Sequence, residues 1–278
     1  MVASEPLADE PGTDLGADLV GVVLAAGAGR RLAPLTRLRP KPLCPVGNVP
    51  LLDLALERLR SAGIARVAVN VHHGRAAMEA HLAERPVHVS IEEREALGTA
   101  GALGHLRSWI AGAGTVVVNA DAWCPGSLRP LVEGWDGERV RLLLVGEDEL
   151  TPGSRVAGAL MPWRDVAALP ASPAGLYEHS WAAAQRDGRL EVVRHDGPFV
   201  DCGTPRDYLE ANLRAVGQGA LVDPSATVTG AVERSAVGVG AVVAGTVRRS
   251  VLWSGAEVRA GEHLEGAVRT GSLTLLVR

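Results

Sequence analysis

The sequence has few aromatic residues, few cysteines and a single lysine among its 278 residues. Because Phe, Trp and Tyr together make up only 3% of the chain, its core must be built mostly from Val, Leu and Ala. The three cysteines, Cys44, Cys124 and Cys202, are isolated, with no C-x-x-C spacing. This pattern indicates reduced thiols and argues against a disulfide framework or a zinc site.

Two further absences concern location and partners. No apolar run approaches membrane-spanning length and no secretory signal is visible, so we expect a cytoplasmic protein with no membrane partner. The formal net charge of −4 does not suggest a nucleic-acid surface. Basic residues gather instead between residues 30 and 41, which suits a small anionic ligand.

The stretch from Val20 to Pro45 joins an apolar run to a glycine turn and this cluster of cations. Its first six residues are typical of a strand that is covered on both faces of a parallel sheet. The run breaks at Gly27 and Gly29, where bare backbone N–H groups can approach an anion. Lys41, the only lysine, stands between two prolines that restrict its direction. The stretch therefore predicts a polyphosphate site.

The same residues resemble the signature of the sugar-1-phosphate nucleotidyltransferases. That signature is a strand, then L-A-A-G-x-G-x-R-L-x-P-L-T, then P-K-P. It is filled here by Leu24, Ala25, Ala26, Gly27, Gly29, Arg31, Leu32, Pro34, Leu35, Thr36, Pro40, Lys41 and Pro42. A second string, D-x-G-T-P-x-D-Y-x-x-A-N, begins at Asp201 and is also similar to the family. The resemblance covers about residues 20 to 216.

Hydrophobic periodicity and turn residues predict alternating strands and helices over the same region. We expect strands at residues 66–71, 87–91, 115–120, 139–145, 155–161 and 190–193. We expect helices at residues 51–62, 76–82, 98–110, 127–135 and 176–186, and another after Pro205.

The C-terminal part carries an internal repeat of fifteen residues. Three sets of small or aliphatic residues recur at this period: Val222, Val237 and Leu252; Val228, Val243 and Val258; Ala226, Ala241 and Ala256. The six-residue spacing within each copy fits a left-handed β-helix. Three short turns of such a coil would be marginally stable alone, so we expect a homo-oligomer that assembles through it.

The fold class predicted is therefore α/β: a Rossmann-like, mostly parallel mixed sheet with helices on both faces, followed by a short left-handed β-helix. We divide the chain into a disordered tail at residues 1–18, a nucleotidyltransferase domain at 19–217 and a hexapeptide-repeat coil at 218–278. The tail assignment rests on its richness in Asp, Glu, Pro, Gly and Ala.

The resemblance implies four groups of site residues. The catalytic group comprises Arg31, Lys41 and Asp121, and the metal group comprises Asp121 and Asp201, which would hold Mg²⁺. The sugar phosphate would contact Asn119, Arg155, Gly158 and Glu178. The nucleotide would contact Leu24, Ala25, Ala26, Gly27, Gly29, Arg30, Arg31, Glu92, Gly98 and Thr99.

Two departures from the family pattern lie near these residues. Ala120 stands where the family has Gly before the metal-binding aspartate. Residues 147–152 contain no lysine, although the family places one there to hold the sugar phosphate, and Arg155 is the nearest cation.

The implied reaction joins an NTP to a sugar-1-phosphate and releases pyrophosphate. A phosphate monoester has a second pKa of about 6, so the attacking oxygen is already anionic and no general base is required. Catalysis is then positioning and charge stabilisation. Guanine offers N–H donors from which Glu92 or Glu93 would accept, and the resemblance leans toward mannose-1-phosphate guanylyltransferases. We therefore favour GTP with mannose-1-phosphate or a related manno-configured sugar phosphate.

Several alternatives stay open. They are uridylyl or thymidylyl transfer to another sugar-1-phosphate, a catalytically inactive regulatory homologue, and a nucleotidyltransferase for an alcohol phosphate such as phosphocholine. The presence of Arg31, Lys41 and both aspartates argues against the inactive homologue. About 50 residues of coil are too few for an acyltransferase site.

Overall fold

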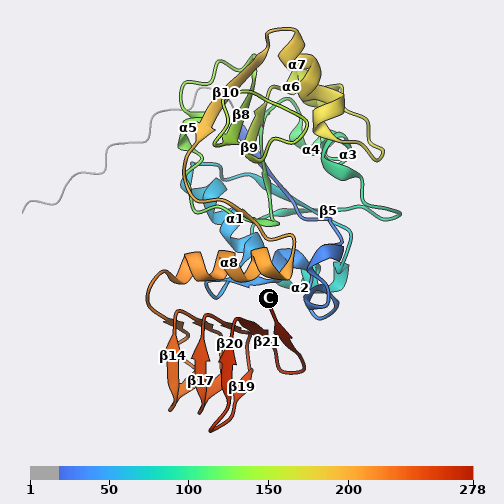
Figure 1. The fold of residues 1–278 in the computed structure, drawn as a ribbon. Coiled ribbons are helices and arrows are strands. Elements are labelled where there is room, and N and C mark those ends of the chain that lie inside the picture. The colour runs from blue at the N-terminus through green and yellow to red at the C-terminus, as the bar shows by residue number, and fades with distance from the viewer. Residues whose placement is uncertain (1–18, 278) are drawn as a thin grey trace, which may run out of the picture.

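A computed structural model describes residues 19–277, so the tail expected at 1–18 lies outside the described residues. An α/β unit occupies one end of the molecule and a coil of short strands the other, with helix α8 between them (Figure 1). Within the described part, no helix is long and apolar enough to cross a membrane.

The α/β unit is built on a seven-stranded sheet with the order β10-β8-β9-β6-β1-β4-β5. Neighbouring strands run parallel except β9, which is antiparallel to both β6 and β8. Every residue of β4 and β8 is buried, as expected for strands covered on both faces. The bounds are β1 Leu19–Leu24, β4 Val67–Val71, β5 His88–Ile91, β6 Gly114–Asn119, β8 Val140–Val145, β9 Val156–Met161 and β10 Leu190–His195.

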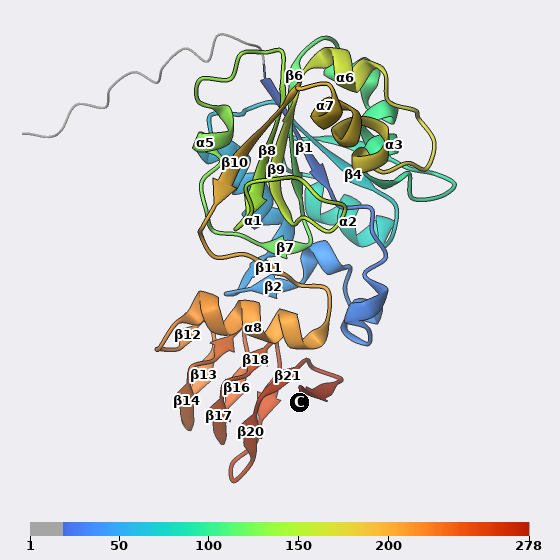
Figure 2. The same cartoon turned by 45° about the horizontal axis from the view of Figure 1, so that its top comes forward.

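Helices cover both faces of this sheet (Figure 2). The two faces of the sheet have separate hydrophobic clusters. Adjacent residues of β1 belong to different clusters, Val23 to one and Val22 to the other. The cluster of Val23 includes helices α1 Leu51–Ser61, α2 Arg75–Leu82 and α5 Arg129–Val132. The cluster of Val22 includes helices α3 Gly98–His105, α4 Arg107–Ile110, α6 Trp163–Ala167 and α7 Ala182–Arg186. The predicted mostly parallel α/β sheet is confirmed.

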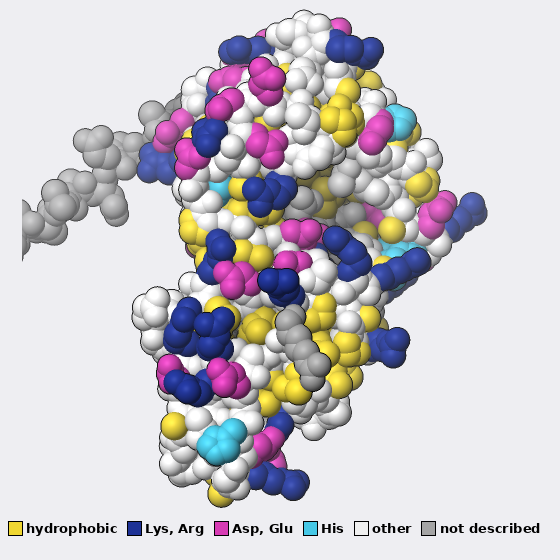
Figure 3. All heavy atoms as spheres, in the orientation of Figure 1, with side chains coloured by type: hydrophobic (Ala, Val, Ile, Leu, Met, Phe, Trp, Pro, Cys, Tyr) yellow, Lys and Arg dark blue, Asp and Glu magenta, His cyan; other side chains and the backbone are white. Residues whose placement is uncertain are grey.

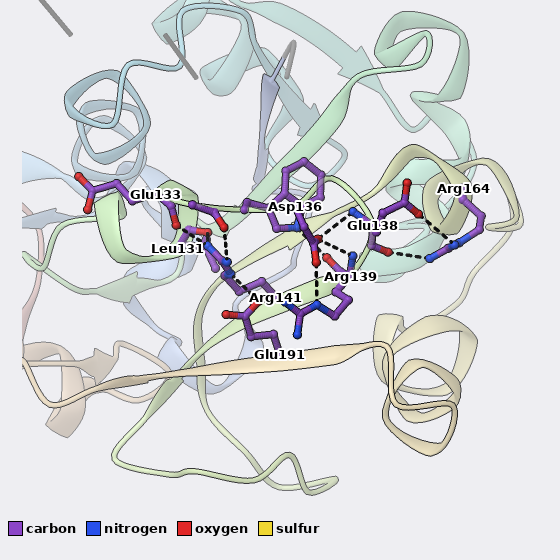
Figure 4. A network of polar contacts seen from close by, with 10 residues as sticks. Leu131, Glu133, Asp136, Glu138, Arg139, Arg141, Arg164 and Glu191 are labelled. Atoms are coloured by element: carbon purple, nitrogen blue, oxygen red, sulfur yellow. Dashed lines mark hydrogen bonds and ion pairs between the residues drawn. The ribbon is translucent and has the colours of Figure 1, made fainter. Parts of the chain in front are cut away.

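Helix α5 is much shorter than the helix predicted at 127–135, and Arg141 accounts for this (Figure 4). The buried Arg141 guanidinium donates to the carbonyls of Leu131, Glu133 and Gly134, and its Nε lies 3.0 Å from Glu191. These carbonyls at the end of α5 therefore bond to a strand side chain instead of a further helical turn.

The loop after α5 is closed by Asp136 (Figure 4). Its carboxylate accepts from the backbone N–H of Arg139 and Glu138 and from the Arg139 guanidinium, and these bonds hold the pKa of Asp136 well below its ordinary value.

Two further helices also differ from prediction. The helix expected at 98–110 divides at Leu106, which is buried and adopts φ −79° and ψ 0° between α3 and α4. The helix expected at 176–186 begins with a π-helical turn, η4 Tyr177–Trp181, before α7.

The C-terminal coil winds through three sheets of short strands, which are parallel except that β22 is antiparallel to β21. Leu221 pairs with Ala236 and Ala236 with Val251, so the fifteen-residue repeat is confirmed by the strand register. The inward residues Val237 and Val243 are fully buried. The left-handed sense of the coil stays a prediction. The sheets comprise β12 Leu221–Val222, β15 Ala236–Val237, β18 Val251–Leu252, β21 Ala267–Arg269 and β22 Thr274–Leu276; β13 Thr227–Val228, β16 Val242–Val243 and β19 Glu257–Val258; and β14 Ala231–Glu233, β17 Thr246–Arg248 and β20 His263–Glu265.

Helix α8, Pro205–Val216, fastens the coil to the α/β unit. The first residues of α8 account for the Thr-Pro pair in the second family string. Thr204 is the N-cap and accepts from the Asp207 N–H, and Pro205 occupies the first turn, where its missing N–H costs nothing. Further along, the buried Tyr208 hydroxyl donates to the Pro45 carbonyl and accepts from Trp253 of the coil.

We expect Val243→Asp to destabilise the protein by about 3–5 kcal/mol, because it buries an unpaired charge in the coil. Val242→Asp is the matched control, since the neighbouring side chain on the same strand is exposed. Thermal melting measures both variants. Equal melting temperatures would show that Val243 is not part of a packed core.

Candidate functional site

A cavity of about 440 Å³ opens at the carboxyl end of β1, where ligands bind in open parallel sheets. All the predicted nucleotide contacts line it except Glu92, and the predicted sugar contact Asn119 also lines it. Figure 3 shows a hollow near the middle of one face with basic and acidic side chains close together at its rim. The lining residues are Leu24, Ala25, Ala26, Gly27, Ala28, Gly29, Arg30, Arg31, Lys41, Pro42, Asn70, Ala96, Gly98, Thr99, Asn119, Asp121 and Gly203.

Gly27 and Gly29 of the signature turn differ in what surrounds them, and so in why glycine suits each position. Gly29 has φ +59°, and a Cβ there would lie 2.9 Å from Cβ of Lys41 and 3.0 Å from Cγ2 of Thr36. Glycine at this position therefore lets the turn fold back onto the Lys41 stem. A Cβ at Gly27 would meet nothing within 4 Å. Protein packing thus does not require Gly27, whereas a ligand that approaches the backbone does.

Lys41 brings two distant carboxylates together. Its side chain is almost completely buried, and its Nζ donates to Oδ2 of Asp121 at 3.0 Å and to Oδ1 of Asp201 at 3.3 Å. Arg31 adds a contact of 3.6 Å to the other oxygen of Asp201. The structure therefore joins the predicted catalytic and metal-binding residues in one charged group.

Two short strands hold the carboxylates beside each other. Asp121 follows β6 and directly precedes β7 Ala122–Trp123, and Asp201 ends β11 Val200–Asp201. These strands are antiparallel, with Asp201 opposite Ala122, and the Cys202 N–H donates to the Asp121 carbonyl at 3.1 Å. Backbone pairing thus sets the separation of the two side chains.

The donor set fits a hard divalent cation. Both carboxylates are about half exposed, with 52% and 49% of their side-chain surface accessible. No group of three or more His, Cys, Asp and Glu side chains in residues 19–277 is arranged to hold a metal, so water and substrate phosphates would complete the ligands.

The nearby thiols do not belong to this donor set. Burial raises the pKa of both Cys44 and Cys202 to about 12, so both are protonated at neutral pH and neither offers a thiolate.

Glu92 does not face the cavity, which corrects its predicted contact with the base. It is buried, its Oε1 accepts from Asn70 Nδ2 at 2.7 Å and its Oε2 accepts from the Leu97 N–H at 2.8 Å. Asn70 in turn accepts from the Ala25 N–H at 2.7 Å. Glu92 therefore positions the end of β1 relative to the turn before α3. Asn70 also lines the cavity, and a buried polar residue inside a strand usually has a partner of this kind.

The turn that opens α3 is held by a distant loop. Gly98 has φ +70°, and a Cβ there would lie 2.6 Å from the Ala174 carbonyl oxygen. Thr99 Oγ1 accepts from the Leu176 N–H at 2.8 Å instead of capping its own helix. Both residues line the cavity, as predicted, and both also pack against the loop around residue 174.

Three of the predicted sugar-phosphate contacts lie away from the cavity lining. The Arg155 guanidinium lies 6.0 Å from the Phe199 ring centroid. The Glu178 carboxylate fills the space beside Gly175.

Gly158 is corrected as well. A Cβ at this position would lie 3.0 Å from Cδ2 of Leu128 and 3.2 Å from Cδ2 of Leu131. Glycine there permits the packing of α5 and of the residue before it, which is a structural reason for glycine that the predicted sugar contact did not consider.

Five lining residues had no role in the predicted site: Ala28, Pro42, Asn70, Ala96 and Gly203. Of these, Pro42 and Gly203 had a signal, since they belong to the signature string and to the second family string. A Cβ at Gly203 would lie 2.9 Å from Nη2 of Arg31, so glycine makes room for that guanidinium.

Known proteins with similar sequences support the same kind of site. A family model described as nucleotidyl transferase matches residues 20–144. The N-acetylmuramate alpha-1-phosphate uridylyltransferase of Caulobacter vibrioides is 34% identical over 233 residues, which cover 70% of this chain and 96% of the relative. A mannose-1-phosphate guanyltransferase of Emericella nidulans is 26% identical over 224 residues, which cover 68% of this chain and 62% of the relative.

A solved structure from Bacillus anthracis, provisionally named as a glucose-1-phosphate thymidylyltransferase, matches with a TM-score of 0.58 at 20% identity. It covers 71% of this chain and 95% of that chain, and at this identity it supports the fold alone. The signature turn, the paired aspartates and the near-complete coverage of the uridylyltransferase agree, and this chain belongs to the sugar-1-phosphate nucleotidyltransferase family.

Proposed function

We propose that this protein transfers a nucleotidyl group from an NTP to a sugar-1-phosphate and releases pyrophosphate. The observation that carries the proposal is the contact of Lys41 with Asp121 and Asp201 beside the glycine turn. A buried ammonium, two carboxylates and bare backbone at one sheet edge suit two phosphate groups that must react.

The reaction balances without a protein base. An anionic oxygen of the sugar phosphate attacks the α-phosphorus of the NTP, and the bond from that phosphorus to the bridging oxygen of the pyrophosphate breaks. The electron pair leaves with pyrophosphate. The protein must therefore bring two polyanions together and stabilise the charge on the departing group.

Each side chain has a role in this scheme. The backbone from Gly27 to Gly29, with Arg30 and Arg31, holds the triphosphate and the departing pyrophosphate. Lys41 lies between the α-phosphate and the sugar phosphate. Asp121 and Asp201 would hold Mg²⁺, which when bound supplies further positive charge to the phosphate oxygens.

The hydrogen bonds of the Glu92 carboxylate bear on which NTP we favour as the substrate. The preference for GTP rested on a free carboxylate that would accept from guanine, and both Glu92 oxygens are already engaged inside the protein. Glu93 lies on the surface, where it pairs with Arg75 at 3.1 Å. The Caulobacter vibrioides relative is named for uridylyl transfer to N-acetylmuramate α-1-phosphate. We therefore favour UTP with an amino-sugar or acidic-sugar 1-phosphate over GTP with mannose-1-phosphate.

A substrate panel tests the function. We expect pyrophosphate release with Mg²⁺ and UTP above that with GTP, ATP, CTP or dTTP, and we expect EDTA to abolish it. The sugar phosphates compared would include N-acetylmuramate-, N-acetylglucosamine-, glucose- and mannose-1-phosphate. Absence of pyrophosphate release with every pair would contradict the transferase function. A preference for GTP with mannose-1-phosphate would contradict the choice of substrate alone.

Glu92→Gln tests whether this residue positions the turn or reads the base. We expect the free energy of unfolding to fall by about 1–3 kcal/mol, because the new amide N–H₂ would face either the Asn70 or the Leu97 donor. We also expect KM to rise by the same factor for every NTP. Glu93→Gln is the matched surface control and should behave as wild type. A changed ratio of GTP to UTP turnover at unchanged melting temperature would instead make Glu92 a base-reading residue.

Lys41→Arg tests the role of the lysine in charge stabilisation. We expect kcat to fall on the order of 10²-fold at saturating substrates, since a planar guanidinium does not replace a compact ammonium between Asp121 and Asp201. The exposed Arg37→Lys in the same segment is the control. Wild-type kcat in Lys41→Arg would refute the catalytic role, and a lowered melting temperature with wild-type kcat in the folded fraction would assign Lys41 to loop structure.

A further inference from the structure

Two arginines of the C-terminal coil occupy a backbone conformation that ordinarily suits glycine. Arg234 and Arg249 have φ of +45° and +46°, in the left-handed region that is unfavourable for a residue with a Cβ. They stand at the same position of consecutive turns, because each directly follows one residue of the register pair Glu233 and Arg248. The next turn has Gly266 at this position, with φ +58°. The local backbone therefore favours glycine in all three turns, and the two arginines need another reason.

Buried serine side chains fix the corner of the coil that carries these arginines. Ser235 and Ser250 are both fully buried. The Ser250 N–H donates to Oγ of Ser235 at 3.0 Å, and that hydroxyl donates to the Glu233 carbonyl at 2.7 Å. The Arg249 N–H donates to the same carbonyl at 3.0 Å. The corner thus holds the two arginine backbones at about the 4.8 Å spacing of neighbouring strands.

Both arginines line a cavity of about 210 Å³ between the coil and the end of helix α8. Arg214 and Gln218 line it too, and so does Glu210, whose carboxylate pairs with Nε of Arg214 at 2.8 Å. Within residues 19–277, no hydrogen bond or ion pair engages the guanidinium of Arg234 or Arg249, and Nε of Arg234 is buried without a partner. Figure 3 shows basic side chains gathered where the end of α8 meets the coil. The described lining therefore has an excess of positive charge.

We propose that this cavity is a binding site for the phosphate group of a small anionic ligand. This inference does not rest on the proposed reaction. Two unpaired guanidinium groups present two planar forks of N–H donors, and the Gln218 amide adds a further donor. The oxygens of a tetrahedral phosphate can accept from both forks, whereas the two oxygens of a planar carboxylate match one. A bound anion also offsets the repulsion between two cations one strand spacing apart.

The cavity is separate from the catalytic cleft. Within the part of the chain that the structure describes, the two linings share no residue. Helix α8 lies between them, since Gly203 before its start lines the cleft and Gly217 after its end lines the second cavity. A helix of 12 residues is about 18 Å long, so one phosphate or pyrophosphate cannot occupy both places.

A competing explanation is that the two arginines only offset the negative end of the α8 dipole. The two explanations differ in their consequence for stability. If the arginines serve the helix, their removal should lower the melting temperature. If they serve a ligand, glycine at both positions should leave the melting temperature of the free protein unchanged or raise it, because glycine relieves the left-handed backbone.

Titration with inorganic phosphate at low ionic strength, followed by calorimetry and thermal melting, tests the proposal. We expect phosphate to stabilise the wild-type protein, and we expect Kd to rise about tenfold or more in the double variant Arg234→Gly, Arg249→Gly, which loses both forks. Its kcat without added phosphate should equal the wild-type value. Arg248→Ala with Arg259→Ala is the matched control, since it removes the same charge from exposed positions of the coil outside the cavity lining.

Two further arms identify the source of the phosphate group and guard against misfolding. Pyrophosphate and glucose-1-phosphate are titrated beside phosphate, and the ligand whose affinity falls most in the double variant shows whether the site takes a free anion or a sugar phosphate. If the glycine variant fails to fold, Arg234→Asn with Arg249→Asn replaces it, because asparagine also enters the left-handed region.

Three results would overturn the proposal. The first is that wild-type protein binds none of these ligands at millimolar concentration. The second is equal affinity in the folded double variant and the wild type, which would place the bound phosphate in the catalytic cleft. The third is a lowered melting temperature of the double variant with an unchanged response to phosphate, which would assign the arginines to the end of α8.

Discussion

The pairing of the Lys41 ammonium with Asp121 and Asp201 is the interaction on which the arrangement of the cleft depends. A buried ammonium without partners costs several kcal/mol, so Lys41 can occupy its position only when both carboxylates are in place. The carboxylates come from segments 80 and 160 residues away along the chain. The charged group therefore forms only after the main sheet and the β7–β11 pair have both assembled. The same dependence ties the signature turn to its partners without any contact from a ligand.

A second buried network sets the other wall of the cleft. The bonds from the Ala25 N–H to Asn70, from Asn70 to Glu92, and from the Leu97 N–H to Glu92 connect the ends of three neighbouring strands to the turn before α3. Polar groups in such a network are costly to bury unless each finds its partner, which favours a single arrangement. Backbone groups that line the cavity are thus positioned by a carboxylate that does not line it.

The signature segment and the C-terminal coil share one hydrophobic core. Leu32 and Leu35 of the signature pack in the same cluster as Tyr208 of α8 and Trp253 of the coil. The guanidinium of Arg39 also lies 4.9 Å from the Trp253 ring centroid. The coil therefore packs against the signature segment that lines the cavity, and we expect the coil and the α/β unit to stabilise each other.

Much of the architecture was determined by the sequence alone, because short-range rules decide it. Apolar runs predicted the buried strands, glycines marked the turns, and a fifteen-residue period predicted the strand register of the coil. The signature string likewise identified Gly27, Arg31 and Lys41, and the family resemblance identified Asp121; the structure brings all four to one cavity. Tertiary structure decided what depends on partners far along the chain. Glu92 turned inward because Asn70 and Leu97 offer donors there, Gly158 serves the packing of Leu131, and Arg141 ended a helix early by taking its carbonyls. Local periodicity carries no information on which atoms a side chain will meet across the fold, and those atoms determined each of these roles.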